Sequence, residues 1–272
     1  MNDSSYVHGY SHTESQRLSD QADTLGKLLH HDSFFTPSGR VLEAGCGTGA
    51  QTVIVAPQNP ECNFVSIDIS IDSLSAAARK ITDRNISNVT IHSADVFNLP
   101  FNDETFDHVF ICFLLEHISQ PAHALGSLKR VLKTGGTITV IEGDHGSAYY
   151  HPRSAAAQAT IRCLVDIQAE MGGNSLIGRE LYPLLVNAGF AGVSVTPRVV
   201  YADAGHPEMV DGFTRKTFIA MVEGVKEQAI GSGMITETGW EQGIAELYRS
   251  ADTDGTFNYT FFKAVGRKAG RN

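Results

Sequence analysis

The chain has 272 residues, a hydrophobic content of 42% and a formal net charge of -9. This length and composition allow one large α/β domain with a sizeable core, and the acidic balance disfavours a nucleic-acid partner, which requires a basic surface. No apolar run approaches the roughly 18 residues of a membrane span, and the polar N-terminus lacks the apolar segment of a signal peptide, so we expect a cytoplasmic protein that does not enter a membrane.

The cysteines support the same compartment. They are Cys46, Cys62, Cys112 and Cys163, and no two of them form a C-x-x-C pair. Each lies in an apolar or glycine-rich setting. We therefore expect reduced thiols and no metal site.

Residues 1–36 are predicted to form a helical segment ahead of the first strand, because an apolar face with helical periodicity runs from residue 17 to residue 29. The stretch "SYVHGYS" concentrates Tyr6, His8 and Tyr10. One hypothesis is an aromatic lid over an active-site cleft, with Tyr6 and Tyr10 taking part in catalysis and His8 binding the substrate. The alternative is an anchoring or homo-oligomer contact.

Five strand-like runs follow, with helical stretches between them. Predicted helices begin at Gly49, at Ser70 as an N-cap (70–85) and at Pro121, the last ending on the pair Gly135–Gly136. Strands that alternate with helices indicate βαβ units and a parallel sheet. The predicted strands are 40–45, 63–69, 89–94, 106–113 and 136–143.

The pattern changes after residue 143. Helices are predicted over 154–171 and 178–190, a strand over 193–201, a helical region over about 207–250 and a last strand over 255–266. We see no internal repeat and no linker.

The stretch "VLEAGCGTGA" (41–50) places Gly45, Gly47 and Gly49 directly after the first strand. Without Cβ atoms this backbone can take positive φ values and lie against a ligand, at the sheet edge where open α/β folds bind ligands. The same residues also satisfy the dinucleotide-binding pattern G-x-G-x-x-A.

Charge favours a different ligand. Glu43 precedes the turn by two residues, and a carboxylate there would repel a pyrophosphate. It suits S-adenosylmethionine, which carries an ammonium and a sulfonium and no phosphate. Asp68 ends the second strand, where an acid can accept both ribose hydroxyls. Asp95 ends the third strand, where it can accept from the adenine amino group while Val96 packs on the ring.

The chain resembles the class I S-adenosylmethionine-dependent methyltransferases. The motifs that carry the resemblance are "VLEAGCGTG", "SIDIS", "ADVFNLPF", "FDHVFICFLLEHI" and "LKRVLKTGGTITVIEGD", which occur in the family's order over residues 40–144. The resemblance implies a Rossmann-like seven-stranded sheet with the order 3-2-1-4-5-7-6 and strand 7 antiparallel. It implies a methyltransferase domain over 37–272, with a cofactor half (37–150) and substrate-shaping helices at about 151–190 and 207–250.

The resemblance also implies roles for single residues. Glu43 would lie near the methionine ammonium, Asp68 near the ribose and Asp95 near the adenine. Phe113 would line the cleft near the donor methyl, and His117 would start a helix near the cofactor. The turn residues Gly45, Cys46, Gly47 and Gly49 would approach the cofactor backbone.

The variable regions "YVHGYSHTESQRLSDQADTLGKLL" and "VIEGDHGS" resemble a narrower group, the actinomycete enzymes that C-methylate the prenyl chain of teleocidin-type indole alkaloids. This similarity implies a small hydrophobic acceptor, a carbocation after methyl transfer and S-adenosylhomocysteine as product. A phenol, amine or quinone acceptor remains open. So do a nicotinamide-dependent oxidoreductase and a non-catalytic relative that only binds the cofactor.

The candidate acceptor residues lie outside the glycine turn. His145, at the end of the fifth strand, is a candidate general base, or else a loop histidine that caps a turn. Tyr201, Phe213 and Phe218 are candidates for the acceptor pocket, with core packing as the alternative. The sequence permits either a monomer or a homo-oligomer.

Overall fold

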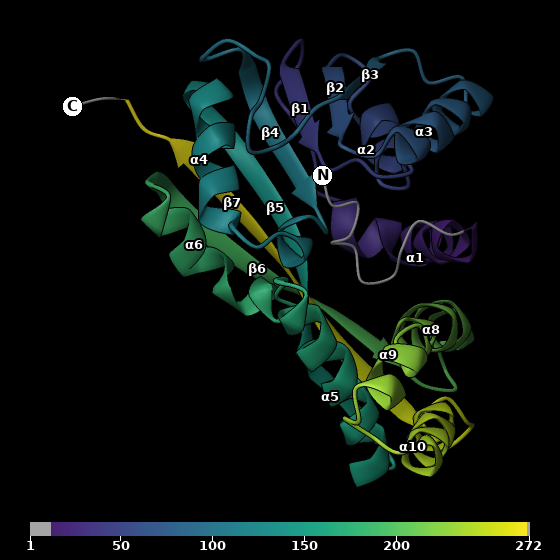
Figure 1. The fold of residues 1–272 in the computed structure, drawn as a ribbon. Coiled ribbons are helices and arrows are strands. Elements are labelled where there is room, and N and C mark those ends of the chain that lie inside the picture. Colours follow the sequence, from purple (N-terminus) through teal and green to yellow (C-terminus); the bar gives the residue numbers. More distant parts are fainter. Residues whose placement is uncertain (1–11, 271–272) are drawn as a thin grey trace.

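The computed structural model describes the backbone of residues 12–270 and the side chains of Arg17 and of residues 20–270. Seven strands form one sheet in the order β3-β2-β1-β4-β5-β7-β6, with β7 antiparallel to both of its neighbours (Figure 1). The predicted order and the antiparallel strand are confirmed. The strands are β1 (Arg40–Ala44), β2 (Asn63–Asp68), β3 (Val89–Ser93), β4 (Phe106–Cys112), β5 (Leu132–His151), β6 (Phe190–Ala202) and β7 (Thr256–Lys268).

Helices cover both faces of the sheet. Neighbouring residues of β1 show this, because Val41 joins a core cluster with Leu25 and Leu29 of α1, whereas Leu42 joins one with Leu125 of α4. Side chains alternate between the two faces of a strand, so a strand buried on both faces reads as a continuous apolar run. The helices are α1 (His12–His30), α2 (Thr52–Gln58), α3 (Ile71–Asp83), η1 (Leu115–His117), α4 (Pro121–Val131), α5 (Ala155–Glu170), η2 (Ile177–Glu180), α6 (Leu181–Asn187), α7 (Pro207–Met209), η3 (Val210–Ile219), α8 (Ala220–Glu223), α9 (Lys226–Gly231) and α10 (Glu237–Arg249).

The glycine pair after α4 has a different role from the one predicted. The helix ends at Val131, and Leu132 already pairs with Phe106 of β4. The pairing then shifts in register, and a Cβ on Gly136 would lie 2.7 Å from the Asp107 carbonyl oxygen. The pair therefore lets β5 bulge past β4 at close range, and the prediction that the helix ends on it is wrong.

The strands β5, β6 and β7 are long and continue past the other four. With α5, α8, α9 and α10 they build a second lobe, which is the lower part of Figure 1. The predicted fifth strand stops at residue 143, but β5 continues to His151, which pairs with Thr256. An irregularity between Asp144 and Tyr149 separates the two parts of β5.

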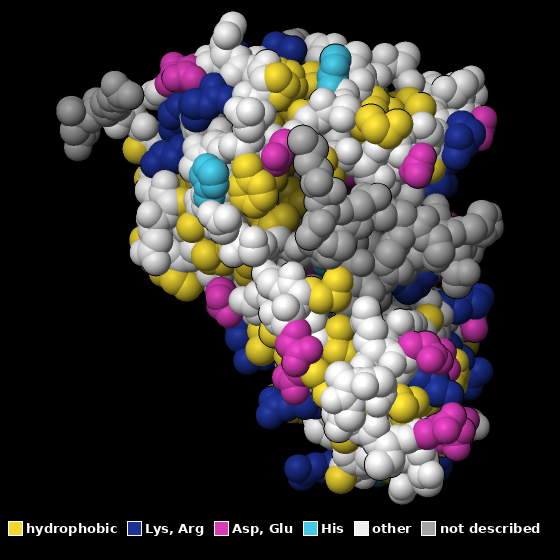
Figure 2. All heavy atoms as spheres, viewed as in Figure 1, with side chains coloured by type: hydrophobic (Ala, Val, Ile, Leu, Met, Phe, Trp, Pro, Cys, Tyr) yellow, Lys and Arg dark blue, Asp and Glu magenta, His cyan; other side chains and the backbone are white. Residues whose placement is uncertain are grey.

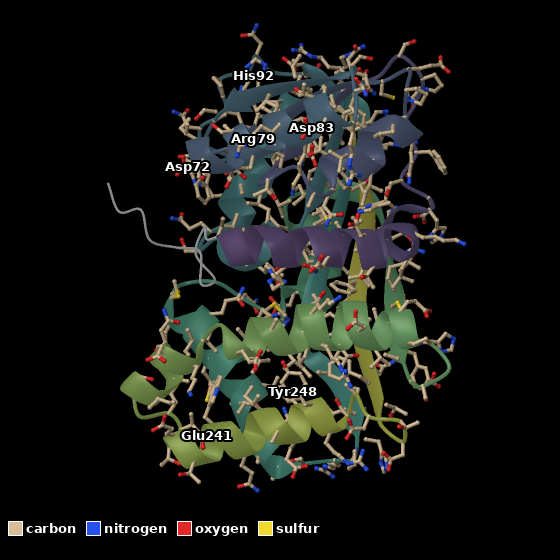
Figure 3. The ribbon with its side chains drawn as sticks, turned by 90° about the vertical axis from the view of Figure 1, so that its right-hand side faces the viewer. Asp72, Arg79, Asp83, His92, Glu241 and Tyr248 are labelled. Carbon is tan, nitrogen blue, oxygen red and sulfur yellow. The ribbon has the colours of Figure 1, made fainter. Side chains whose placement is uncertain are left out.

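The first lobe consists of the rest of the sheet with its helices, and helix α1 lies between it and the second lobe. In Figure 3 it runs between α3, which carries the labelled Asp72, Arg79 and Asp83, and the lower helices, which include α10 with Glu241 and Tyr248. It packs against η3, whose hydrogen bonding is of the π-helical type. A π-helical stretch of this length is rare, and such stretches occur often at functional sites.

The C-terminal end of α1 is fixed by His30. This side chain is fully buried, its Nε2 lies 2.7 Å from Gln51 Oε1, and its ring meets that of Phe110 edge-on. Burial lowers the pKa of His30 from 6.5 to about 4, against the opposing hydrogen bond with Gln51. The folded protein therefore holds this histidine neutral.

We predict that protonation of His30 destabilises the fold in acid. The unfolded histidine titrates near 6.5 and the folded one near 4, so the stability that depends on the neutral ring is complete above pH 6.5 and is lost as the pH falls toward 4. Over this interval the free energy of unfolding of the wild type should fall by roughly 3 kcal/mol more than that of His30→Gln. Urea unfolding at several pH values measures both.

The neighbouring His31 is exposed and provides the control. His31→Gln should keep the pH dependence of the wild type. Equal pH dependence in the wild type and in His30→Gln would contradict the prediction.

Candidate active site

A cavity of about 820 Å³ opens at the carboxyl ends of β1, β2 and β4. Its other walls come from α1, α5, η3 and β7, so it lies between the two lobes. Figure 2 shows the molecule in the same view as Figure 1. Hydrophobic side chains are visible in the hollowed upper half of this face. The position agrees with the rule that open α/β sheets bind ligands outside the carboxyl ends of their strands.

The glycine turn forms one wall of this cavity. Gly45, Gly47 and Gly49 all have positive φ values, of 74°, 51° and 75°. A Cβ on Gly45 would lie 2.8 Å from Leu114 Cδ1, and one on Gly49 would lie 3.0 Å from Ala77 Cβ, whereas one on Gly47 would meet nothing within 4 Å. Packing therefore requires Gly45 and Gly49. The backbone at Gly47 faces open space without a side chain, so a ligand can approach it closely.

Glu43 lies behind the turn with its side chain 3% exposed. Its Oε2 accepts hydrogen bonds from Ser66 Oγ at 2.6 Å and Thr52 Oγ1 at 2.8 Å. Burial raises the pKa of the Glu43 carboxyl, although these two bonds oppose the effect. The wall of the cavity therefore holds an acid that lacks a cationic partner among the described residues and would gain from a positive ligand.

The other two predicted acids line the same cavity. Asp68 Oδ2 accepts from the backbone N–H of Gly47 at 2.8 Å, and Oδ1 accepts from Ser70 at 2.9 Å, so this carboxylate ties the turn to the end of β2. Asp95 follows β3 by two residues rather than ending it, and its Oδ1 accepts from the N–H of Phe97 at 2.9 Å. The adjacent Val96 also lines the cavity.

Cys46, Phe113 and His117, the remaining residues expected near the cofactor, line the cavity as well. Phe113 has a φ of 60°, which is unusual for a residue with a side chain. Its ring lies 5.5 Å from that of Phe261. Strain of this kind persists where the surrounding structure enforces it, and it is frequent at ligand sites.

His145 is buried and lines the cavity, and its Nδ1 lies 2.7 Å from the Tyr259 hydroxyl. Burial lowers the pKa of His145, and burial raises the pKa of Tyr259 well above its ordinary value. Gly143 makes the contact possible, because a Cβ there would lie 2.4 Å from the Tyr259 hydroxyl. The pair therefore presents a neutral imidazole and a neutral phenol.

Two buried carboxyl groups lie beside this pair. Burial alone would raise the pKa of Glu116, but the neighbouring His117, whose Nε2 is 3.3 Å from Glu116 Oε1, lowers it below its ordinary value. Burial and the charge of Glu116 raise the pKa of Glu142 well above its ordinary value. The pair therefore consists of an ionised Glu116 and a protonated Glu142.

The other predicted acceptor residues are distributed differently. Phe213 lines the cavity. Phe218 is fully buried against Phe257, with ring centroids 4.8 Å apart, and lies outside the lining. Tyr201 is half exposed on β6, also outside the lining. Tyr6, His8 and Tyr10 lie outside the described residues.

Sequence reasoning missed several residues of the acceptor side. Arg17 comes from α1, Gln168 from α5, and Tyr259 and Phe261 from β7. The alternation in "FNYTFF" is a signal that would have placed Tyr259 and Phe261 on one face of a strand. It does not by itself tell which face meets the cavity.

Among residues 12–270, no helix is long and apolar enough to cross a membrane. Within the same part of the chain, no three His, Cys, Asp or Glu side chains are placed to hold a metal ion.

The chain matches known proteins over the half that carries the glycine turn. A family model described as a methyltransferase domain matches residues 35–189. An uncharacterized methyltransferase of Schizosaccharomyces pombe is 30% identical over 162 residues, which are 57% of this chain and 58% of that protein. A demethylmenaquinone methyltransferase of Bacillus cereus is 26% identical over 144 residues, which are 48% of this chain and 61% of that protein.

The fold is shared with solved structures. The geranyl diphosphate C-methyltransferase of Streptomyces coelicolor superposes with a TM-score of 0.54 at 15% identity, covering 91% of this chain and 75% of that one. The chain spans between 54% and 61% of the length of the first curated relatives that it matches.

We predict that Gly47→Ala weakens binding of S-adenosylhomocysteine at least tenfold while the fold remains intact. The Cβ would point into open space, but the positive φ costs on the order of 1–2 kcal/mol for a residue with a side chain, and the methyl group would stand between backbone and ligand. Isothermal titration measures the affinity, and circular dichroism checks the fold.

Gly126 provides the matched control, because it lies inside α4 and a Cβ there also meets nothing within 4 Å. Gly126→Ala should bind as the wild type does. Wild-type affinity in Gly47→Ala would show that the ligand does not approach this backbone.

Proposed function

The chain belongs to the methyltransferase-domain family, and from this premise we propose that it transfers a methyl group from S-adenosylmethionine to a small, mainly apolar molecule. The observation that carries the proposal is the buried Glu43 behind bare glycine backbone. A dinucleotide would bring a pyrophosphate to this acid, whereas S-adenosylmethionine brings positive charge. The nicotinamide-dependent alternative is therefore disfavoured.

The residues of the cavity fit this cofactor. Glu43 suits the methionine ammonium, Asp68 the ribose hydroxyls, and Asp95 with Val96 the adenine. When bound, S-adenosylmethionine supplies a methyl group that is already activated on a sulfonium. The protein's contribution is to hold the acceptor in line with that group and to exclude water.

The acceptor side supports an apolar substrate, because aromatic rings gather there. Tyr259 and Phe261 lie 4.7 Å apart between ring centroids, and Phe213 and Phe113 lie 5.8 Å and 5.5 Å from Phe261. Aromatic faces stabilise cations. These rings support the finer proposal, which comes from the resemblance of the variable regions to a narrower group: C-methylation of an alkene in a prenyl chain, on an indole alkaloid natural product of the teleocidin type.

The electrons and the proton of this reaction are all accounted for by the acceptor, the methyl donor and the residues present. The alkene π electrons form the new carbon–carbon bond, the carbon–sulfur bond breaks with its electrons remaining on sulfur, and the acceptor is left as a carbocation. The aromatic faces and the ionised Glu116 stabilise this charge. With Nδ1–H of His145 donating to Tyr259, Nε2 accepts the proton whose loss restores an alkene.

A phenol, amine or quinone acceptor is the second candidate. The buried His145–Tyr259 pair favours it, because a neutral imidazole can also take a proton from a hydroxyl or amine. Product analysis distinguishes the two, since the new methyl group is attached to carbon in one case and to oxygen or nitrogen in the other.

We predict that Glu43→Gln weakens binding of S-adenosylmethionine at least tenfold, because the amide keeps the shape of the side chain and loses its charge. Wild-type affinity should rise with pH as the Glu43 carboxyl ionises, at a higher pH than the 4.5 of an ordinary glutamate, because burial raises its pKa. The variant should lack this dependence in isothermal titrations.

Glu61→Gln makes the same change on an exposed side chain just before β2 and should leave the affinity unchanged. A folded wild-type protein that binds NADH and not S-adenosylhomocysteine would overturn the proposed function.

We predict that His145→Gln lowers kcat for methyl transfer to a prenylated indole by ~10²–10⁴-fold, the usual contribution of a general base, without changing the affinity for S-adenosylhomocysteine. Because burial lowers the pKa of His145 below 6.5, the wild-type rate should rise with pH, with the midpoint of the rise below pH 6.5. This rise should be absent in the variant.

Product formation followed by mass spectrometry measures the rate. The exposed His92, on β3 (Figure 3), gives the control variant His92→Gln. An unchanged rate in His145→Gln would remove His145 from the mechanism.

A further inference from the structure

Two oxygen atoms of residues that line the cavity are buried and have no hydrogen-bond partner among the described residues. They are Glu116 Oε2 and Gln168 Oε1, and both side chains line the cavity. The residues are 8% and 2% exposed. Buried polar atoms are paired in the great majority of cases, and leaving one unpaired is unfavourable.

The orientation of Gln168 is fixed by its neighbours. Its Nε2 donates to the backbone carbonyl of Glu116 at 3.0 Å, and that carbonyl also accepts from the N–H of Asn174 at 2.8 Å. A carbonyl oxygen requires a donor, so the nitrogen of the amide must face Glu116. The atom left over is therefore Oε1, an acceptor.

The unpaired atom of Glu116 is also an acceptor. Its other oxygen, Oε1, lies 3.3 Å from His117 Nε2. Although burial opposes ionisation, His117 beside the carboxyl group and the charge of Arg17 lower the pKa of Glu116. An ionised carboxylate has no proton to donate, so it can only accept hydrogen bonds.

On the premise of the proposed function, we propose that the acceptor molecule carries a neutral N–H or O–H donor that binds to Glu116 and Gln168. The donor supplies the hydrogen bonds that the two oxygen atoms lack. Such a site discriminates strongly, because a molecule without the donor leaves buried oxygen atoms unpaired.

The charges around the site favour a neutral donor over an ammonium group. Arg17 lines the same part of the cavity, and its charge acts on both Glu116 and His145. A second cation would meet the guanidinium of Arg17, and a carboxylate would meet Glu116. An indole N–H, an amide N–H or a hydroxyl meets neither repulsion.

The acceptor is therefore amphipathic. Its apolar part contacts Phe213, Met221 and Phe261, which line the same half of the cavity. Its donor is held at Glu116 and Gln168, which fixes the orientation of the apolar part relative to His145. Orientation of this kind is what methyl transfer requires of the protein.

The experiment compares matched probes in the presence of saturating S-adenosylhomocysteine. Indole is compared with 1-methylindole, phenol with anisole, and benzyl alcohol with benzylamine, by NMR titration of the full-length protein. We expect indole and phenol to bind at least tenfold more tightly than their methylated counterparts, and benzyl alcohol more tightly than benzylamine.

Two variants locate the effect. Glu116→Gln replaces the carboxylate by a neutral amide and should reduce the preference for indole over 1-methylindole severalfold. Glu170→Gln makes the same change on an exposed side chain of α5, outside the cavity lining, and should retain the preference.

Equal binding of indole and 1-methylindole by the wild type, or no binding of any probe at millimolar concentration, would overturn the proposal. An undiminished preference in Glu116→Gln would overturn it as well. Binding of S-adenosylhomocysteine, titrated in the same samples, tests the proposed function separately, because its failure leaves the comparison of donor and methylated probes intact.

Discussion

The burial of a carboxyl group behind side-chain-free backbone is the constraint on which the cofactor half of this molecule depends. Glu43 receives only neutral hydroxyl bonds, from Thr52 and Ser66, and these offset part of the cost of removing a charge from water. A cationic ligand supplies the rest. The carboxylate in turn requires the bare Gly47, because a side chain there would separate the ligand from the wall of the cavity.

The acceptor half depends on the unusual length of three strands. Only because β5 and β7 continue past the rest of the sheet do Tyr259 and His145 face one cavity. Their contact requires a glycine at position 143, since any side chain there would displace the Tyr259 hydroxyl. The same extension provides the surface on which α5 and η3 pack, and these helices add Gln168 and Phe213 to the walls. The second lobe therefore belongs to the site as much as the parallel sheet does.

The sequence was sufficient to predict the cofactor half because its signals are local. The signals are a glycine turn after a strand and acids at successive strand ends. The rule that parallel strands end at one edge is enough to place them together. The acceptor half depends on antiparallel register, which no local signal carries. Tyr259 pairs with Val200 and Tyr201 pairs with Asn258. A difference of one residue places a tyrosine on the opposite face, so Tyr259 reaches the cavity and Tyr201 does not. The glycine pair 135–136 is ambiguous for a similar reason, because a helix end and a bulge against β4 favour the same residues.

The buried acids Glu116 and Glu142 show how the two halves are connected. Two carboxyl groups this close cannot both ionise easily, and the structure distributes the charge through their partners. The proton on Glu142 leaves its Oε1 to accept from the N–H groups of Leu114 and Leu115, which fixes the short helix η1 at the end of β4. That helix carries Glu116 and His117, so the neutral acid positions the ionised one. His117 on the same short helix and Arg17 of α1 in turn lower the pKa of Glu116. A ligand that changes the charge beside either residue therefore acts on the same carboxylate.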